Sequence, residues 1–240
     1  MIGIVGGMGY EAGIDLYNRV QKAGIPKKNI LIISNTNIPD RTEYLDGIES
    51  RNPGPYIAIG IKGLLNDGAT QIGIACNTAH HEEILGTSLR ILEQKGIKVP
   101  IIHMIQEVAK TLKADDSIKK VGVLSTRGTL EHGIYQRVLE AAGQEVIPIN
   151  KEFNDYYVHD AIYHPDFGIK FQYGKPALQK AIDRLAVAVS HLESKGADRL
   201  VLGCTEIPLV ADQLTFKDQP INATQVLADS LVRAFQNSQL

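Results

Sequence analysis

The sequence predicts an α/β protein built from parallel sheets that are covered by helices on both faces. Short β-branched runs alternate with amphipathic stretches almost from end to end, a strand, helix, strand order that is typical of parallel βαβ units. The predicted strands are apolar throughout instead of alternating, as expected for strands with two covered faces. They span residues 2–5, 30–34, 71–75, 99–102, 120–124, 145–148 and 199–202.

The clearest predicted helix spans residues 176–195, where one apolar face is formed by side chains that repeat at spacings of four and three. A further helix is expected over residues 223–237. Glycines close several helices, since glycine adopts the left-handed conformation of a helix C-terminus at little cost. These glycines are Gly24, Gly68, Gly96, Gly143 and Gly196.

A weak internal repeat indicates two similar halves. Residues 2–8 (IGIVGGM) are matched by 121–127 (VGVLSTR), and residues 71–78 (QIGIACNT) by 199–205 (RLVLGCT). In an open parallel sheet, ligands bind beyond the carboxyl ends of the strands. We therefore expect two parallel-sheet α/β domains, residues 1–105 plus 212–240 and residues 106–211, with the active site in the cleft between them. The expected hinges lie near Gln106 and Pro208.

The composition excludes several classes of protein. With 25 basic and 27 acidic residues the formal net charge is −2, so no global field favours nucleic acid or an anionic membrane. The first residues, MIGIVGGMGYEAG, have neither a basic segment nor a long apolar run, and the expected location is the cytoplasm. Two cysteines are too few for a disulfide scaffold.

Two cysteines occupy corresponding places in the repeat. Cys76 lies in IACNTAHH and Cys204 in LVLGCTEIP, each directly after an apolar strand and before a predicted helical turn. The partial positive charge of a helix N-terminus lowers a thiol pKa and favours thiolate. Either cysteine alone reads as a buried small hydrophobe. The pair favours acid/base chemistry, because inverting an α carbon requires a base on one face and an acid on the other.

Two other roles for the cysteines were weighed. Zinc binding would require ligands at metal spacing, whereas His80 and His81 follow Cys76 without a CxxC motif. A single nucleophilic cysteine with His80 or His103 as its base would suit acyl transfer. That role leaves Cys204 unexplained.

Five motifs resemble those of the aspartate/glutamate racemase family, with the aspartate racemase branch the most similar. They are GGMG near the start, IPDRT at 38–42, ACNTAH at 75–80, GVLSTRGT at 122–129 and LGCTEIPL at 202–209. The resemblance implies two α/β domains related by a pseudo-twofold axis, no pyridoxal phosphate, no metal and a homodimer. The implied substrate is a small acidic amino acid, aspartate or glutamate.

The resemblance also assigns site residues. Cys76 and Cys204 become the catalytic pair. Residues in or beside the motifs become the substrate-binding set, which comprises Met8, Asn77, Thr78, Thr126, Thr129, Thr205 and Glu206. Arg41 of PDRT and Lys170 of a GIK motif match residues that recognise the side-chain carboxylate, where a guanidinium binds bidentately and a lysine adds a point charge.

Three positions depart from the pattern or stay open. Tyr10 and Gly13 stand where the family often has proline or tryptophan and a hydroxyl residue, which leaves substrate size open. Glu206 stands where the glutamate racemase branch has histidine, which favours the aspartate branch. Its carboxylate could orient Cys204, bind the substrate ammonium, or stabilise a helix N-terminus.

Gly6, Gly7 and Gly9 do not form a dinucleotide-binding GxGxxG motif and are expected to let the backbone approach the substrate. The predicted reaction is cofactor-independent racemisation of aspartate by two cysteines, with glutamate as the second candidate substrate. The alternatives are a related reaction, such as arylmalonate decarboxylation or maleate isomerisation, and a non-catalytic protein that binds acidic amino acids.

Overall fold

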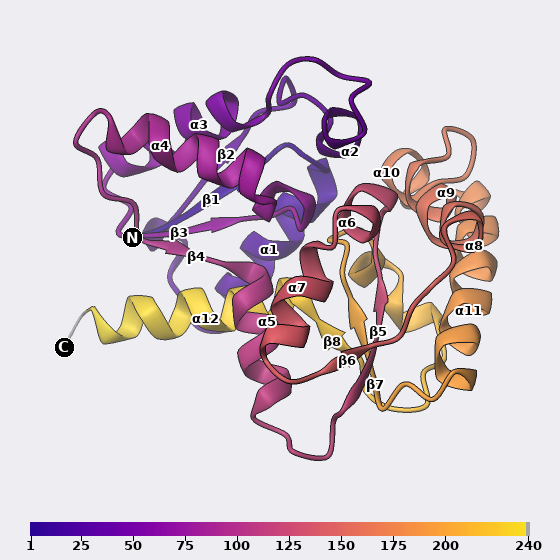
Figure 1. Ribbon diagram of the computed structural model, residues 1–240. Coiled ribbons are helices and arrows are strands. Elements are labelled where there is room, and N and C mark those ends of the chain that lie inside the picture. Colours follow the sequence, from indigo (N-terminus) through magenta and orange to yellow (C-terminus); the bar gives the residue numbers. More distant parts are fainter. Residues whose placement is uncertain (239–240) are drawn as a thin grey trace. The chain divides into compact units, whose positions relative to one another are not determined.

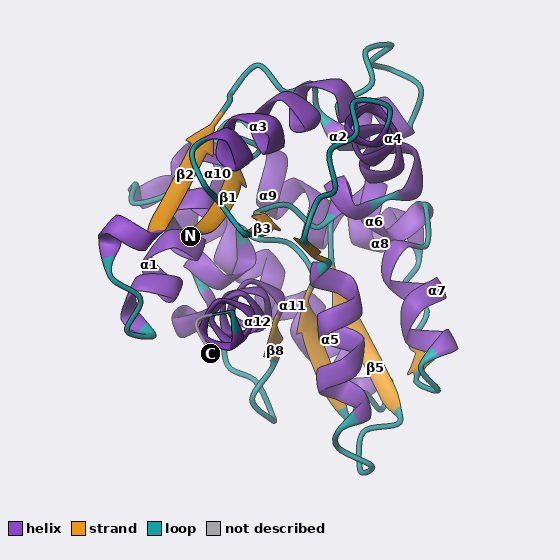
Figure 2. Ribbon diagram, turned by 90° about the vertical axis from the view of Figure 1, so that its left-hand side faces the viewer, coloured by secondary structure: helices purple, strands orange, loops and turns teal. Residues whose placement is uncertain are grey.

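The computed structural model describes residues 1–238. The chain divides into two compact units, the first formed by Met1–Glu107 with the segment from Thr224 onward and the second by Val108–Ala223. Gln239 and Leu240, the end of the segment expected in the first domain, lie outside the described residues. Figure 1 shows the elements in chain order, and Figure 2 shows the strands surrounded largely by helices.

The first unit contains a parallel sheet with the strand order β2-β1-β3-β4. The strands are β1 (Ile2–Gly6), β2 (Ile30–Ser34), β3 (Gln71–Ile74) and β4 (Ile101–Ile102). The helices are α1 (Tyr10–Lys22), α2 (Arg41–Leu45), α3 (Gly54–Asn66), α4 (Thr87–Glu93), α5 (Met104–Lys113) and α12 (Ala223–Asn237). The last residues of α5 belong to the second unit. β1 is buried along its whole length, whereas in β2, at the edge, only Ile30 is buried and the residues after it alternate between partly buried and exposed.

The second unit repeats this topology with the strand order β6-β5-β7-β8, again all parallel. The strands are β5 (Lys120–Leu124), β6 (Glu145–Val146), β7 (Arg199–Leu202) and β8 (Ile221–Asn222). The helices are α6 (Arg127–Glu131), α7 (Ile134–Ala141), α8 (Lys151–Asn154), α9 (Asp160–Tyr163), α10 (Ile169–Gln172) and α11 (Gln179–Ser194). The shared strand order confirms the two similar parallel-sheet halves.

A glycine in each central strand solves the same packing problem. A Cβ on Gly3 would come within 2.8 Å of Ile72 and 3.2 Å of Leu64, and one on Gly122 would come within 2.6 Å of Leu200 and 3.1 Å of Leu192. In both units two side chains crowd the glycine. One belongs to the residue paired with it on the neighbouring strand, and the other belongs to a helix, α3 in the first unit and α11 in the second. The repeat seen in the sequence therefore records one steric arrangement used twice.

Both faces of the first sheet are covered by helices. α3 packs over the face that Gly3 presents, because Leu64 lies beside it. The register pairs Ile4 with Gly73, so Gly73 presents the opposite face, where Leu231 of α12 lies 2.7 Å from the position of a Cβ. The central strands β1 and β3 accordingly lack the alternation of a half-exposed sheet.

The predicted elements agree closely with the structure except at short strands. Three predicted strands match β2, β5 and β7 residue for residue, and the predicted last helix matches α12. The predicted helix 176–195 is a 3₁₀ turn, Pro176–Leu178, followed by α11. All five predicted cap glycines have positive φ, between 72° and 96°.

β8 was missing from the predicted strands, since two residues carry too little pattern to be seen. It pairs with β7 and holds residues 212–223 in the second unit, whereas the sequence places them in the first domain. The other change of unit occurs within α5, between Glu107 and Val108, beside the expected hinge at Gln106.

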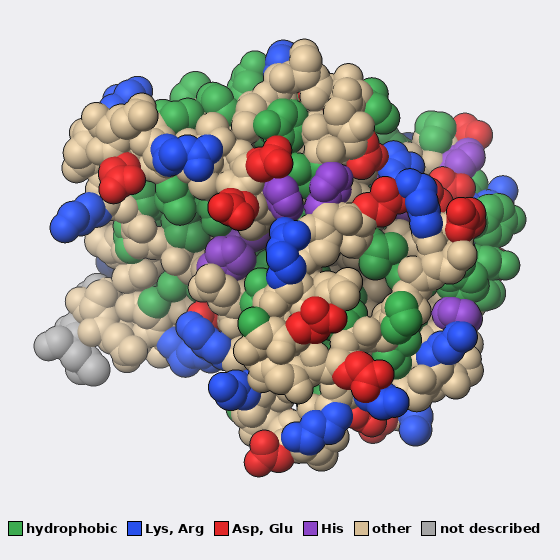
Figure 3. All heavy atoms as spheres, viewed as in Figure 1, with side chains coloured by type: hydrophobic (Ala, Val, Ile, Leu, Met, Phe, Trp, Pro, Cys, Tyr) green, Lys and Arg blue, Asp and Glu red, His purple; other side chains and the backbone are tan. Residues whose placement is uncertain are grey.

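Charged side chains of both signs are interspersed over the face seen in Figure 3, as the net charge of −2 leads one to expect. None of the helices in the described chain is both long and apolar enough to cross a membrane.

Candidate functional site

Each unit carries one candidate catalytic cysteine at the carboxyl edge of its sheet. Cys76 follows β3 and Cys204 follows β7, and both are buried, with 7% and 6% of their surface exposed. Val5 pairs with Ile74, and Leu124 pairs with Leu202, in the last rungs of the two central strand pairs. The loops after β1 and β5 therefore lie beside the cysteine turns of their own units.

The turn that contains Cys76 is tight and polar. The backbone N–H of Cys76 donates to the carbonyl of Ile74 at 2.9 Å, and Asn77 and Thr78 follow as buried side chains. The expected helix after Cys76 is only a 3₁₀ turn, Thr78–His80. Three residues align few peptide dipoles, so the helix effect on this thiol is weaker than the sequence indicated.

His80 is held by backbone on both sides of its ring. Nδ1 lies 2.8 Å from the carbonyl oxygen of Cys76, and the N–H of Met104 donates to Nε2 at 3.2 Å. Burial, and then the charge of His103, lower the pKa of His80 to about 3. Both nitrogens are thus engaged and the ring is neutral, which argues against His80 as the base of a single nucleophilic cysteine.

We expect this buried neutral imidazole to make the protein acid-labile. The folded-state pKa of His80 lies below the ordinary value of 6.5, so the unfolded chain binds a proton that the folded chain rejects between pH 6.5 and about 3. Stability is complete above pH 6.5 and is lost as the pH falls, by roughly 1 kcal/mol per pH unit for one proton. Urea denaturation at several pH values should show a smaller slope for His80→Asn, and equal slopes would contradict this.

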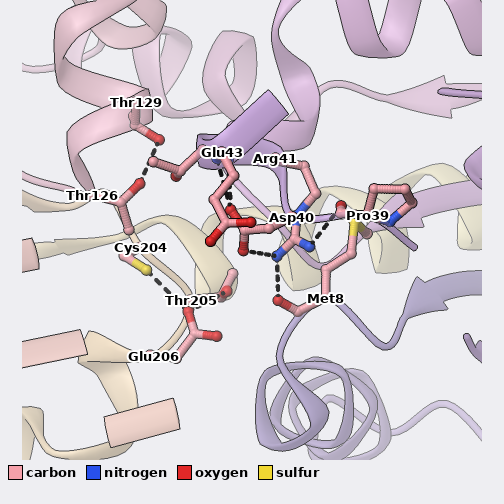
Figure 4. Close-up of polar contacts among 11 residues, drawn as sticks. Met8, Pro39, Asp40, Arg41, Glu43, Thr126, Thr129, Cys204, Thr205 and Glu206 are labelled. Atoms are coloured by element: carbon pink, nitrogen blue, oxygen red, sulfur yellow. Dashed lines mark hydrogen bonds and ion pairs between the residues drawn. The ribbon is translucent and has the colours of Figure 1, made fainter. Parts of the chain in front are cut away.

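Arg41 joins two loops of the first unit. It is 4% exposed, and its guanidinium donates to the carbonyl of Met8 at 2.6 Å and to that of Pro39 at 3.1 Å. Figure 4 shows these bonds, with the Asp40 carboxylate 3.8 Å away. Asp40 also caps α2 through the N–H groups of Thr42 and Glu43. The GGMG and PDRT motifs therefore form one connected structure, and Met8 contributes its backbone oxygen to it.

Within the GGMG segment, packing requires a glycine at position 7. A Cβ on Gly7, whose φ is +90°, would collide with the backbone of Asn35. Gly13 and Gly6 pack against each other, with the Cβ position of Gly13 3.4 Å from the Cα of Gly6. That distance is an ordinary van der Waals contact, so the structure gives no steric reason for the departure from the family pattern at position 13.

The turn that contains Cys204 is built around a buried carboxylate. The thiol Sγ of Cys204 donates to Oε2 of Glu206 at 2.9 Å, and the hydroxyl of Thr205 donates to the same oxygen at 3.1 Å (Figure 4). Burial first, and then the Glu206 charge and hydrogen bond, raise the pKa of Cys204 well above its ordinary value. The expectation of a lowered pKa is therefore wrong for Cys204, because burial and then the neighbouring carboxylate outweigh the short helical turn.

Three further predicted residues lie in the second unit. Thr126 caps α6 directly after β5, and its hydroxyl donates to that of Thr129 at 3.3 Å. The Lys170 ammonium lies 3.8 Å from the centre of the Tyr163 ring, and its charge opposes the rise in the pKa of Cys204. Lys170 therefore acts electrostatically on the same turn as Glu206.

The sequence reasoning missed Tyr135. This buried residue of α7 lies 3.0 Å from the Cβ position of Gly203, and its pKa is raised by burial and then by Cys204. A tyrosine on an amphipathic helix reads as core, so no sequence signal would have found it.

Within residues 1–238 no group of three or more His, Cys, Asp or Glu side chains is arranged to hold a metal ion.

Comparisons with known proteins place the chain in a family. Residues 5–231 match the family model described as Asp/Glu/Hydantoin racemase. The broad specificity amino-acid racemase RacX of Bacillus subtilis is 29% identical over 178 residues, which cover 73% of this chain and 69% of that protein. The glutamate racemase of Aquifex pyrophilus is 32% identical over 172 residues, 70% of this chain and 59% of the relative, so the chain spans less than two thirds of that enzyme.

Among solved structures, the Picrophilus torridus aspartate racemase matches with a TM-score of 0.76 and 25% identity, over 97% of this chain and 93% of that one. The two-unit parallel fold and the family match agree along nearly the whole chain. This chain therefore belongs to the Asp/Glu/Hydantoin racemase family and is an amino-acid racemase, an isomerase, of that family.

Proposed function

We propose that this racemase interconverts L- and D-aspartate, with glutamate as a second substrate, through Cys76 and Cys204 and without a cofactor. The observation that carries the proposal is the Cys204 turn, where a buried thiol donates to the buried Glu206 carboxylate at 2.9 Å. The corresponding turn of the other unit presents a second buried thiol. Two buried thiols at corresponding strand ends suit a reaction that is nearly symmetrical in its two directions.

In one direction the Cys76 thiolate removes the α proton and the Cys204 thiol delivers its own proton to the opposite face. The reaction leaves Cys76 protonated and Cys204 as thiolate, and the reverse reaction starts from that state. A raised pKa makes the Cys204 thiolate a strong base once formed, which suits the weakly acidic α carbon. Glu206 accepts the hydrogen of the thiol between turnovers and so orients Sγ.

The same carboxylate has a second oxygen for the substrate. Oε1 of Glu206 is buried and has no hydrogen-bond partner in the part of the chain that the structure describes. A buried carboxylate oxygen without a donor is costly, and the ammonium group of an amino acid would satisfy it. We assign Glu206 both to Cys204 and to the substrate ammonium.

Polar side chains beside the two thiols would bind the rest of the substrate. Asn77 and Thr78 follow Cys76, while Thr205 follows Cys204, and all three are buried. Thr126 and Thr129 lie at the adjacent strand end of the second unit. Fixed donors of this kind stabilise the negative charge that develops on the α-carboxylate when the proton leaves.

Selectivity for an acidic side chain is assigned to Arg41 and Lys170. Arg41 adds positive charge beside the GGMG loop while it holds that loop in place. Lys170 lies near enough to Cys204 to influence its thiol. Both would attract a second carboxylate, and losing a charge-assisted contact costs about 1.5 to 3 kcal/mol, or roughly tenfold to a hundredfold in kcat/KM.

We expect Lys170→Met to lower kcat/KM for aspartate by roughly tenfold to a hundredfold, with little change for alanine. Lys180→Met is the matched control, because Lys180 also sits over an aromatic ring, at 4.4 Å from Phe167. Steady-state kinetics on both amino acids measures the effect. An equal loss on both would assign Lys170 to the α-carboxylate or to the fold.

The test of the reaction is chiral chromatography of each enantiomer of aspartate, glutamate and alanine after incubation with chelator-treated protein. We expect both aspartate enantiomers to converge on a racemic mixture without pyridoxal phosphate or metal. Alanine is included because the Bacillus subtilis relative is described as having broad specificity. Inversion of alanine in preference to aspartate would overturn the substrate assignment, and a requirement for added pyridoxal phosphate would overturn the mechanism.

The homodimer and the cytoplasmic location belong to the same proposal. Sedimentation velocity of the purified chain tests the first, and cell fractionation tests the second.

A further inference from the structure

His80 is a fixed link between two backbone groups of the first unit. Its Nδ1 faces the Cys76 carbonyl at 2.8 Å, and its Nε2 faces the Met104 N–H at 3.2 Å. A carbonyl only accepts and an amide N–H only donates, so the ring must carry its proton on Nδ1 and present a lone pair at Nε2. A second proton at Nε2 would point at the Met104 N–H.

The surroundings of His80 favour this single neutral form. The ring of His103 lies edge-on at 4.7 Å between centroids, and the pKa of His103 is itself lowered by burial. Glu107 opposes that shift, and its carboxylate also accepts from Ser230 at 2.9 Å and faces Arg233 at 3.7 Å. The Glu107 carboxylate that acts on His103 is thus shared with Ser230 and Arg233. His80 therefore keeps its tautomer across the neutral pH range.

The backbone N–H and the backbone carbonyl of Cys76 both form hydrogen bonds. Its N–H donates to Ile74 at 2.9 Å, and its carbonyl accepts from His80. These bonds fix the peptide planes on the two sides of the Cys76 α carbon, and hence the direction of the Cα–Cβ bond from which Sγ is reached. Proton transfer between carbon and sulfur is sensitive to this direction, since a misplacement of about 1 Å can cost roughly a hundredfold in rate.

We propose that His80 is a positioning residue that aims the Cys76 thiol by tying the Cys76 carbonyl to the first residue of α5. The inference rests on the proposed role of Cys76 in proton transfer. Met104 begins α5, the helix in which the chain passes from the first unit to the second. The same imidazole therefore attaches the cysteine turn to the connection between the units.

The kinetic test compares His80→Ala, His80→Asn and His80→Gln. The amide nitrogen of asparagine can take the place of Nδ1 and donate to Cys76, whereas glutamine extends toward the place of Nε2. We expect His80→Ala to lower kcat by roughly tenfold to a hundredfold with little change in KM, and His80→Asn to recover part of the loss. His164→Ala is the control, because His164 also accepts a backbone N–H, that of Asp166 at 3.2 Å.

The loss of kcat/KM must be the same in both directions, because the equilibrium constant of a racemisation is one, but the isotope effect should differ between them. With α-deuterated aspartate, the isotope effect on kcat/KM should rise in His80→Ala for the enantiomer that Cys76 deprotonates and stay unchanged for the other. A purely structural role would leave the two isotope effects unchanged or change them equally, and that result would overturn the proposal. Loss of one limb of the pH–rate profile between pH 5 and 9 in His80→Asn would also overturn it, since His80 would then carry a proton.

Two measurements do not depend on racemase activity. Nitrogen-15 NMR should show His80 protonated at Nδ1 and bare at Nε2 from pH 8 to pH 5. In a Cys204→Ser background, the rate at which iodoacetamide alkylates Cys76 should change in His80→Ala. In His80→Asn it should return toward the rate of the protein that keeps His80. If the protein inverts no amino acid, the proposed function fails while these measurements still decide the positioning role. Alkylation that is unchanged in His80→Ala would contradict it.

Discussion

Replacement of either cysteine by alanine is expected to lower racemisation in both directions by roughly a hundredfold to ten-thousandfold, the range for removing a positioned acid or base. In the proposed mechanism each turnover needs Cys76 on one face of the α carbon and Cys204 on the other, so neither thiol can compensate for the other. Chiral chromatography measures the rates. Because both residues are buried at strand ends, thermal melting with and without aspartate must show that each variant folds and binds.

Exchange in deuterium oxide sharpens this test. A variant that keeps one thiol should wash out the α proton of one enantiomer only, without inverting it. Near-native inversion by either single variant would contradict the two-cysteine mechanism. Cysteine to serine replacements serve as size controls, because a hydroxyl fits the same space and is a much weaker acid than a thiol.

Glu206→Gln should produce two changes of opposite sense. The carboxylate raises the pKa of Cys204 by its charge and by accepting the thiol hydrogen, so an amide in its place should lower that pKa. In a Cys76→Ser background, the alkylation of Cys204 should therefore proceed at lower pH. Racemisation should nevertheless fall by roughly a hundredfold, because the thiolate becomes a weaker base and the substrate ammonium loses its partner.

Glu193→Gln provides the matched control for Glu206→Gln. Glu193 is also a carboxylate of the second unit, and it accepts a backbone bond from Lys217 at 2.7 Å. We expect its replacement to leave both the alkylation profile and the rate unchanged. Faster racemisation in Glu206→Gln would show that the carboxylate restrains Cys204 instead of serving it.

The sequence predicted what depends on local pattern. Strands such as β5 and β7 are continuous apolar runs, and glycines such as Gly68 mark helix ends, so periodicity and backbone preference were sufficient to place them. β8 escaped because its two residues are held in place by pairing with β7. That pairing depends on a partner distant in sequence, and local pattern carries no information about it.

The site shows the same division. The two cysteine turns could be found from strand ends and repeated motifs. The raised pKa of Cys204, the bonds from Arg41 to Met8, and the tautomer of His80 depend on which buried groups meet after folding. A motif fixes which residue types are present, whereas these properties depend on distances of about 3 Å between groups that the motif does not join.

The carboxylate beside Cys204 also has a consequence for oxidative damage. The thiolate and not the thiol attacks peroxide, and the oxidation to sulfenic acid, which precedes sulfinic and sulfonic acid, begins with that attack. Burial and the Glu206 charge keep the Cys204 sulfur protonated in the structure. Cys204 therefore spends little time in the form that peroxide consumes, so the arrangement that would make it a strong base in the proposed reaction also protects its sulfur from oxidation.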